Sequence, residues 1–184
     1  MSTTPLSAAS TAQQINILVV IDTDYVKTNY PNPSKDPARP TGIDHHSQYM
    51  ICTDPRGGID KQGTADLQFS ALPGDYVSYT GVSIYNNSDD AVIVYGINYW
   101  KGDNVFNQFV PNLVVRNGAA QPDPTTKNGL PAKPMQQSFS SFDSKVMKAG
   151  TEFFYVNFAL YTLPDGENQQ LYGYFYWDPS IQVK

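Results

Sequence analysis

The stretch 75–100, DYVSYTGVSIYNNSDDAVIVYGINYW, constrains the fold most, because two runs of β-branched and aromatic residues flank a short polar segment. Such residues favour the pleated, half-buried surface of a strand. The segment between the runs, 86–90, consists of Asn, Ser and Asp, which hydrogen-bond to nearby backbone and tolerate turn geometry. This arrangement predicts a β-hairpin. Apolar residues on both sides of 91–97 predict a central strand that is covered on both faces.

Further short runs along the chain have the same character. They are 15–21, 48–53, 64–70, 105–110, 112–116, 138–147, 152–163 and 171–177. No stretch longer than about ten residues shows the 3.6-residue period of an amphipathic helix. The pattern predicts an all-β fold, an antiparallel two-sheet β-sandwich of Greek-key or jelly-roll-like type with little or no helix. We expect one domain over 15–184, preceded by a flexible N-terminal tail at 1–14.

Two proline-rich segments interrupt the strand pattern. The segments 22–46 and 117–137 contain four prolines each. Proline lacks a backbone N–H and fixes φ, so neither segment is expected to form a regular helix or a central strand. Irregular connections of this length in a compact domain are usually functional or disordered.

The charge pattern disfavours nucleic-acid binding. Charged residues make up 16% of the chain, the net charge is −5, and no basic run occurs, whereas contact with phosphates needs clustered Lys and Arg. A lightly charged surface rich in tyrosine suits a homo-oligomer or a neutral polar ligand. Cys52 is the only cysteine, which fits a reducing compartment. Without a secretory signal or an apolar run of about 20 residues, we expect a cytoplasmic protein with no membrane span.

Several segments resemble the AidA/PixA inclusion-body protein family of bacteria. They are INILVVIDTDYVKTNYPNPSKDPARPTGIDHHSQYMICTDPRG (15–57), GTADLQFSALPGDYVSYTGVSIYNNSDDAVIVYGINYW (63–100) and LYGYFYWDPSIQV (171–183). The resemblance implies a β-sandwich protein that self-associates, is regulated with quorum sensing or late growth, and takes part in bacterial–host interaction. It implies accumulation in cytoplasmic inclusions and no catalytic residues. PixA-like proteins are methionine-rich, whereas this chain has four Met.

No catalytic motif is present, so the sequence predicts a non-enzymatic protein without a cofactor. Asp22-Thr23-Asp24 has the form of a DxD metal–nucleotide motif, but aspartates at a strand end usually cap a turn. His45 and His46 are adjacent and would point to opposite faces of an extended chain, so both do not easily bind one ion. Cys52 lies in an apolar strand pattern, where thiols are usually inert.

A carbohydrate-binding lectin, with calcium as a possible cofactor, is the alternative function. Sugar sites combine an aromatic face with Asp and Asn side chains on loops, and calcium takes oxygen ligands. The candidate ligand-binding residues are Trp100, Asp103, Asn104, Asp89 and Asp90. The competing interpretation is that Trp100 closes the core and Asp103-Asn104 only forms a turn. The stripe of Tyr172, Tyr174 and Tyr176 is either an interface or a covered sheet face.

Overall fold

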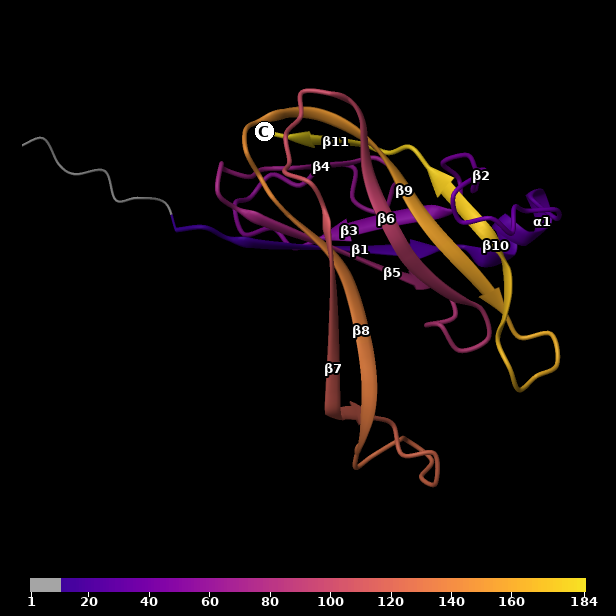
Figure 1. Ribbon diagram of the computed structural model, residues 1–184. Coiled ribbons are helices and arrows are strands. Elements are labelled where there is room, and N and C mark those ends of the chain that lie inside the picture. Colours follow the sequence, from indigo (N-terminus) through magenta and orange to yellow (C-terminus); the bar gives the residue numbers. More distant parts are fainter. Residues whose placement is uncertain (1–10) are drawn as a thin grey trace, which may run out of the picture.

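The computed structural model describes residues 11–184, and most of its regular structure is strand (Figure 1). The strands are β1 (Gln14–Ile21), β2 (Thr41–Gly42), β3 (Gln48–Cys52), β4 (Leu67–Phe69), β5 (Tyr76–Ser83), β6 (Ala91–Gly102), β7 (Val110–Gln121), β8 (Lys133–Lys145), β9 (Gly150–Thr162), β10 (Gln170–Trp177) and β11 (Ser180–Val183). A short helix, α1, spans Thr23–Asn29. The predicted tail at 1–14 falls mostly outside the described residues, and Gln14 already belongs to β1.

The strands form two sheets. Sheet A has the order β3-β1-β5-β8-β7, and sheet B has the order β2-β10-β9-β11-β4, with β6 paired to β9 as well. The pairs β1–β5, β2–β10 and β4–β11 are parallel, and the other pairs are antiparallel. The predicted all-β sandwich is therefore confirmed, although the sheets are mixed rather than purely antiparallel.

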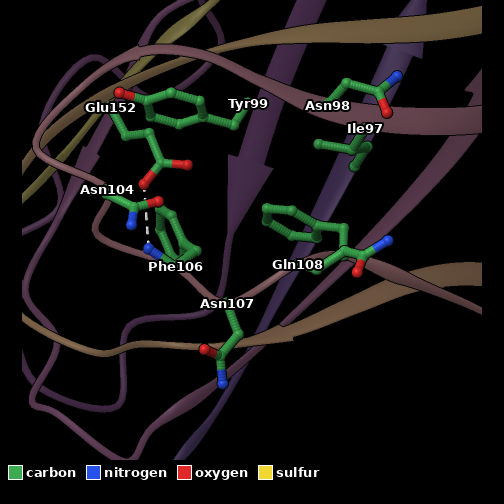
Figure 2. A pocket seen from close by; sticks show the side chains of 9 residues that line it. Ile97, Asn98, Tyr99, Asn104, Phe106, Asn107, Gln108 and Glu152 are labelled. Atoms are coloured by element: carbon green, nitrogen blue, oxygen red, sulfur yellow. Dashed lines mark hydrogen bonds between the residues drawn. The ribbon is translucent and has the colours of Figure 1, made fainter.

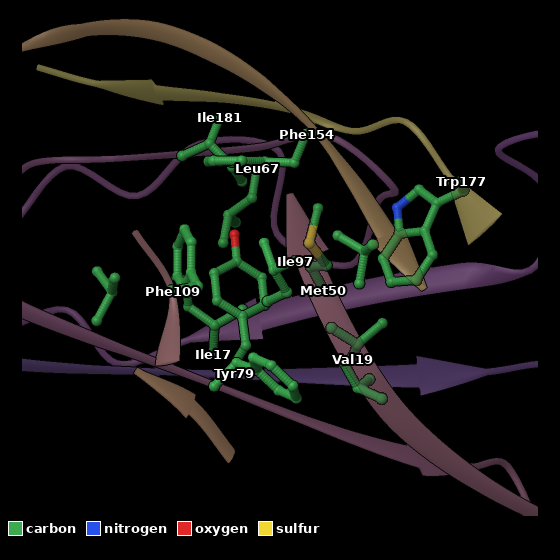
Figure 3. Close-up of a cluster of buried hydrophobic side chains, with 14 of the residues drawn as sticks. Ile17, Val19, Met50, Leu67, Tyr79, Ile97, Phe109, Phe154, Trp177 and Ile181 are labelled. Carbon is green, nitrogen blue, oxygen red and sulfur yellow. The ribbon is translucent and has the colours of Figure 1, made fainter. Parts of the chain in front are cut away.

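The core lies between the inner faces of the two sheets (Figure 3). Strict alternation in β9 places four large apolar side chains inside, all of them fully buried: Phe154, Val156, Phe158 and Leu160. Alternate residues of β1 and β5 face them from sheet A, among them Ile17, Val19 and Tyr79. The two-residue period thus fixes which face of each strand is buried.

β5 and β6 do not form the predicted hairpin. β5 pairs with β1 and β8 in sheet A, whereas β6 pairs with β9 in sheet B. The connection at 84–90 therefore crosses from one sheet to the other. Gly81 allows the crossing, because a Cβ there would lie 2.5 Å from Cγ2 of Val94 on β6. The inner faces of the two strands pack against each other instead of sharing hydrogen bonds.

The prediction that 91–97 is a central strand covered on both faces is wrong. β6 has a strand partner on one side only, and its outer face is open: Ile93 is 47% exposed. Val92, Val94 and Ile97 supply the buried side. The apolar residues on the second side of this run therefore mark an exposed surface.

The segment 22–46 contains α1, although no regular helix was expected there. Asp22 caps the helix, since its Oδ1 accepts a hydrogen bond from the backbone N–H of Tyr25 (3.0 Å). All four prolines follow the helix, beginning at Pro31, so none of them interrupts it. Within residues 11–184 no helix has the length and apolar character needed to cross a membrane.

β7 and β8 are longer than predicted and continue through prolines. Pro111 lies in β7, the edge strand of sheet A, where a missing N–H donor is tolerated. The second proline-rich connection is therefore only 122–132. β5 pairs with 142–145 of β8, so the rest of β8 pairs with β7 alone. We call residues 110–141 the arm; this two-stranded ribbon projects from the sandwich (Figure 1).

Candidate functional site

The outer face of sheet B carries a row of aromatic side chains on β6, β9 and β10. The indole of Trp100 stacks on the ring of Tyr155, with centroids 5.3 Å apart and an interplanar angle of 29°. Tyr155 in turn meets Tyr176 edge to face at 5.2 Å. Nζ of Lys101 lies 4.0 Å from the Trp100 ring centroid, in cation–π geometry. This row gives sheet B an aromatic outer surface.

Two β-bulges in β6 shape this surface. The register with β9 shifts between Val94 and Gly96 and again between Tyr99 and Lys101. The first bulge lets Val94 and Ile97, three residues apart, both face the core. At the second, Trp100 is the extra residue, and it lies on the outer face, 39% exposed. Bulges commonly redirect a side chain in this way. The interpretation of Trp100 as a core-closing residue is therefore wrong.

A groove of about 360 Å³ opens beside this aromatic row, and its residues come from three strands and one loop. They are Arg39, Pro40, Asn98, Tyr155, Asn157 and Tyr176. A Cβ at Gly96 would lie 3.4 Å from both the Asn98 and the Asn157 amide nitrogen. The glycine therefore leaves the space between the two amides open. Ligand sites of this kind combine aromatic walls with a few polar groups.

The proline-rich segment forms one wall of the groove and is held there by hydrogen bonds. Tyr95 Oη donates a hydrogen bond to the Pro37 carbonyl (2.9 Å). Ser34 forms an isolated antiparallel β-bridge with Tyr174 on β10. Within the loop, Arg39 Nε donates to Asp36 Oδ2 (2.9 Å). A hydrogen bond from the Ala38 backbone N–H, together with Arg39, lowers the pKa of Asp36. The contacts of Pro37 and Ser34 hold the loop that carries Arg39 and Pro40 against the sheet.

Asp103 and Asn104 form a turn directly after β6. Asp103 Oδ2 accepts a hydrogen bond from the Thr151 backbone N–H (2.8 Å), and Asn104 has a φ of 55°. Asn104 also lines a separate pocket of about 240 Å³ near Glu152 and Phe106 (Figure 2). Neither residue lines the aromatic groove, so only Trp100 of this predicted group lies beside it.

Glu152 lines the pocket in Figure 2 and is hydrogen-bonded to the backbone there. Its Oε2 accepts hydrogen bonds from the backbone N–H groups of Val105 and Phe106, the latter at 3.0 Å. Burial raises the pKa of Glu152, and these two hydrogen bonds only partly oppose that effect. The carboxyl group thus holds the 105–106 backbone against β9. Because its oxygen serves the backbone, we assign it a structural role.

Asp89 and Asp90 lie at the opposite end of β6 from Trp100. Nine residues of β6, 91–99, separate Asp90 from Trp100, which corresponds to about 33 Å of extended chain. Asp90 is buried and pairs with Lys27 of α1 (2.6 Å), and Lys27 also pairs with Asp24 (3.0 Å). The structure therefore does not bring the two predicted groups of ligand-binding residues together, and Asp90 serves to hold the helix.

The other motifs have structural roles as well. Asp22 caps α1, and His45 contacts Asp66 and Asp178 at 3.4 and 3.3 Å, while His46 contacts Asp44 instead. Across the described residues 11–184 no group of three or more His, Cys, Asp or Glu side chains could hold a metal ion.

Cys52 is half-buried in β3, and burial raises the pKa of its thiol to about 11. The thiolate, which is the nucleophile, is therefore scarce at neutral pH.

Most residues of the groove cannot be recognised from the sequence. Asn98 and Asn157 were its best signal, because asparagine is depleted in strands yet both stand within strongly β-forming runs. Tyr176 was recognised only as part of a stripe, and Arg39 could not be connected with the strands from sequence.

Comparison with known proteins places the chain in a family. A family model described as PixA, inclusion body protein, matches residues 13–183. Among solved structures, the crystal structure of an inclusion body protein (PixA) from Burkholderia cenocepacia J2315 is 30% identical, covers 97% of this chain and 100% of that chain, and has a TM-score of 0.78. A comparison with curated proteins finds no match. The resemblance seen in the sequence is thereby confirmed, and the chain belongs to the PixA inclusion body protein family.

Proposed function

We propose that this protein self-associates through its arm and accumulates in inclusions. The observation that carries the proposal is the concentration of large, exposed apolar side chains on the arm. They are Val110 (53% exposed), Leu113 (78%), Val115 (53%), Leu130 (62%), Met135 (54%) and Phe139 (46%). Leu113 and Val115 lie on one face of the ribbon, and Val110 and Phe139 lie on the other. Exposed apolar patches on a soluble protein usually mark an interaction site.

The arm needs a covering partner for a second reason. A two-stranded hairpin alone is marginally stable in water. The face of the arm that carries Leu113 and Val115 also carries Phe142, which is 9% exposed and packs in the core. The inner face of sheet A therefore continues beyond the sandwich without a second layer. A second molecule would supply that layer.

Charge favours another copy of this chain as the partner. The arm has three basic residues and one acidic residue, so its net charge is +2. The rest of the chain has nine basic and sixteen acidic residues, so its net charge is −7. The arm of one copy is thus attracted to the body of the next. A contact between two different surfaces of the same protein can repeat without closing, which suits growth into an inclusion.

The size of the arm is sufficient for a stable contact. β7 has twelve residues, so the ribbon is about 40 Å long and about 10 Å wide, with about 400 Å² on each face. Covering both faces buries about 800 Å² on this partner, which is typical of a specific interface. The PixA inclusion body family is not a known enzyme family, which agrees with a role in assembly. Regulation by quorum sensing and a role in host interaction stay predictions.

The test is the oligomeric state of the purified protein. We expect size-exclusion chromatography with light scattering to give a mass that rises with concentration. The double variant Leu113→Ser/Phe139→Ser should remain a monomer with an unchanged melting temperature, because both side chains are exposed. Ile84→Ser removes an equally exposed apolar side chain, 57% exposed outside the arm, and should assemble normally.

The same variants can be followed in cells by microscopy. Inclusions should form with the original chain and with Ile84→Ser but not with the arm variant. A monomer at all concentrations, or an arm variant that assembles as before, would show that the arm is not the contact.

A further inference from the structure

The groove on sheet B is lined by polar groups that bond to no other group of the described residues. The amides of Asn98 and Asn157 and the hydroxyls of Tyr155 and Tyr176 make no hydrogen bond within residues 11–184. Asn98 is exposed and the other three side chains are half-buried, so in the free protein these polar groups bond to water. Four such groups line one groove, where the hydroxyl groups of a ligand can replace the bound water.

The chemistry of these groups restricts the ligand. An amide and a phenol each offer a donor and an acceptor, which matches a ligand rich in hydroxyl groups. Arg39 is the only charged residue that lines the groove, and its Nε is already bonded to Asp36. A strongly charged ligand is disfavoured by this lining, and so is a metal ion, because no carboxylate faces the groove.

The aromatic row supplies the apolar half of the recognition. Tyr155 and Tyr176 line the groove and form an aromatic surface beside the amides, and Trp100 stacks on Tyr155 outside the lining. A pyranose ring has one C–H face that can lie on such a surface while its hydroxyl groups reach polar side chains. The volume of about 360 Å³ lies at the lower end of ligand sites, which cover about 300–1,000 Å³, and suits one or two sugar units.

We propose that this groove binds a neutral pyranose sugar, as part of a glycan, without calcium. The inference is independent of self-association, because the groove lies on sheet B and the arm extends sheet A. It also moves the sugar site away from Asp103, Asn104, Asp89 and Asp90, none of which lines the groove.

The test begins with the labelled full chain on a glycan array, with calcium and with EDTA. We expect a reproducible signal for glycans with a terminal neutral pyranose, unchanged by EDTA. Isothermal titration with the methyl glycoside of the strongest sugar then gives a dissociation constant for each variant. Asn157→Ala should weaken binding by about tenfold, since a hydrogen bond contributes about 1.5 kcal/mol, and 1.4 kcal/mol is a factor of ten.

A second variant protects the test against misfolding. Gly96→Ser adds a side chain between the two amides without removing an aromatic ring and should abolish the titration signal. Tyr161→Ala is the matched control, because Tyr161 lies on the outer face of β9 but outside the groove. It should bind as the original chain does.

Three outcomes would overturn the proposal. The first is an array without signal above background. The second is binding that Gly96→Ser and Asn157→Ala leave unchanged. The third is a signal that disappears with EDTA, which would indicate a calcium-dependent site elsewhere.

Discussion

Removal of the buried charge of Asp75 tests how the start of β5, at Tyr76, is stabilised. The carboxylate is 1% exposed and accepts hydrogen bonds from the backbone N–H groups of Gln13 and Leu72, both at 2.8 Å. The guanidinium of Arg56 donates to the same group at 3.0 and 2.6 Å. Burial raises the pKa of Asp75, but Arg56 and the two backbone donors outweigh this effect and lower it to about 2.

The lowered pKa of Asp75 gives the size of its contribution to the free energy of unfolding. A lowering from 3.8 to about 2 corresponds to about 2 kcal/mol of folding free energy for the ionised group. Asp75→Asn keeps the shape of the side chain but removes the negative charge that faces Arg56, whose side chain is 18% exposed. Breaking a buried ion pair costs about 3–5 kcal/mol, and the partial exposure of Arg56 favours the lower end. We expect Asp75→Asn to lower the free energy of unfolding at pH 7 by about 3 kcal/mol.

The pH dependence distinguishes the charge from mere packing. A group whose pKa is lower in the folded state stabilises the protein above its unfolded pKa, near 3.8, and loses that contribution as the pH falls towards the folded value. The difference between Asp75→Asn and the original chain should therefore shrink by about 1 kcal/mol between pH 7 and pH 3. Urea unfolding at each pH, followed by the fluorescence of the buried Trp177, measures it.

Asp89→Asn, at an exposed loop position, is the control and should change the free energy by less than about 0.5 kcal/mol. A difference that stays constant from pH 7 to pH 3 would refute the electrostatic explanation.

Two further predictions concern buried groups in sheet A. The hydroxyl of Tyr79 is buried and has no hydrogen-bond partner in the described part of the chain, so Tyr79→Phe should leave the free energy of unfolding unchanged or raise it by up to about 1 kcal/mol in urea titrations; a loss above 1 kcal/mol would contradict this. Burial raises the thiol pKa of Cys52 to about 11. Iodoacetamide at pH 8 should therefore label Cys52 in the native protein at least about 100-fold more slowly than in the urea-unfolded protein. Similar labelling rates would show that the thiol is accessible and ionisable.

Local patterns predict which residues form strands and which side is buried. β9 is the clearest case, because Phe154, Val156, Phe158 and Leu160 alternate in sequence and are all fully buried. α1 was missed because seven residues are too few to establish a helical period, and its capping residue Asp22 looked like part of a metal motif. β2 and β11, with two and four residues, are too short to give a pattern of their own.

Partner choice could not be predicted from the same patterns. Asn86 and Asn87 adopt positive φ angles of 54° and 61°, and such a turn serves a hairpin or a crossing between sheets equally well. The decision depends on contacts far apart in sequence, such as Gly81 against Val94. For the same reason Trp100 could be recognised as a candidate, whereas its neighbours Asn157 and Tyr176 could not, because they come from other strands.

The separation of arm and groove leads to a prediction about their coupling. Leu113 lies on an extension of sheet A, and Gly96 lies on the outer face of sheet B, so neither substitution touches the other surface. Substitutions at sites that share no partners add within about 0.5 kcal/mol. Leu113→Ser should therefore change the sugar dissociation constant by less than about twofold, and Gly96→Ser should leave the assembly mass unchanged.

The double variant should show the sum of both effects in light scattering and in titration. A sugar affinity that falls when the arm is altered would mean that a second copy contributes to the groove, and the two functions would then belong to one composite site.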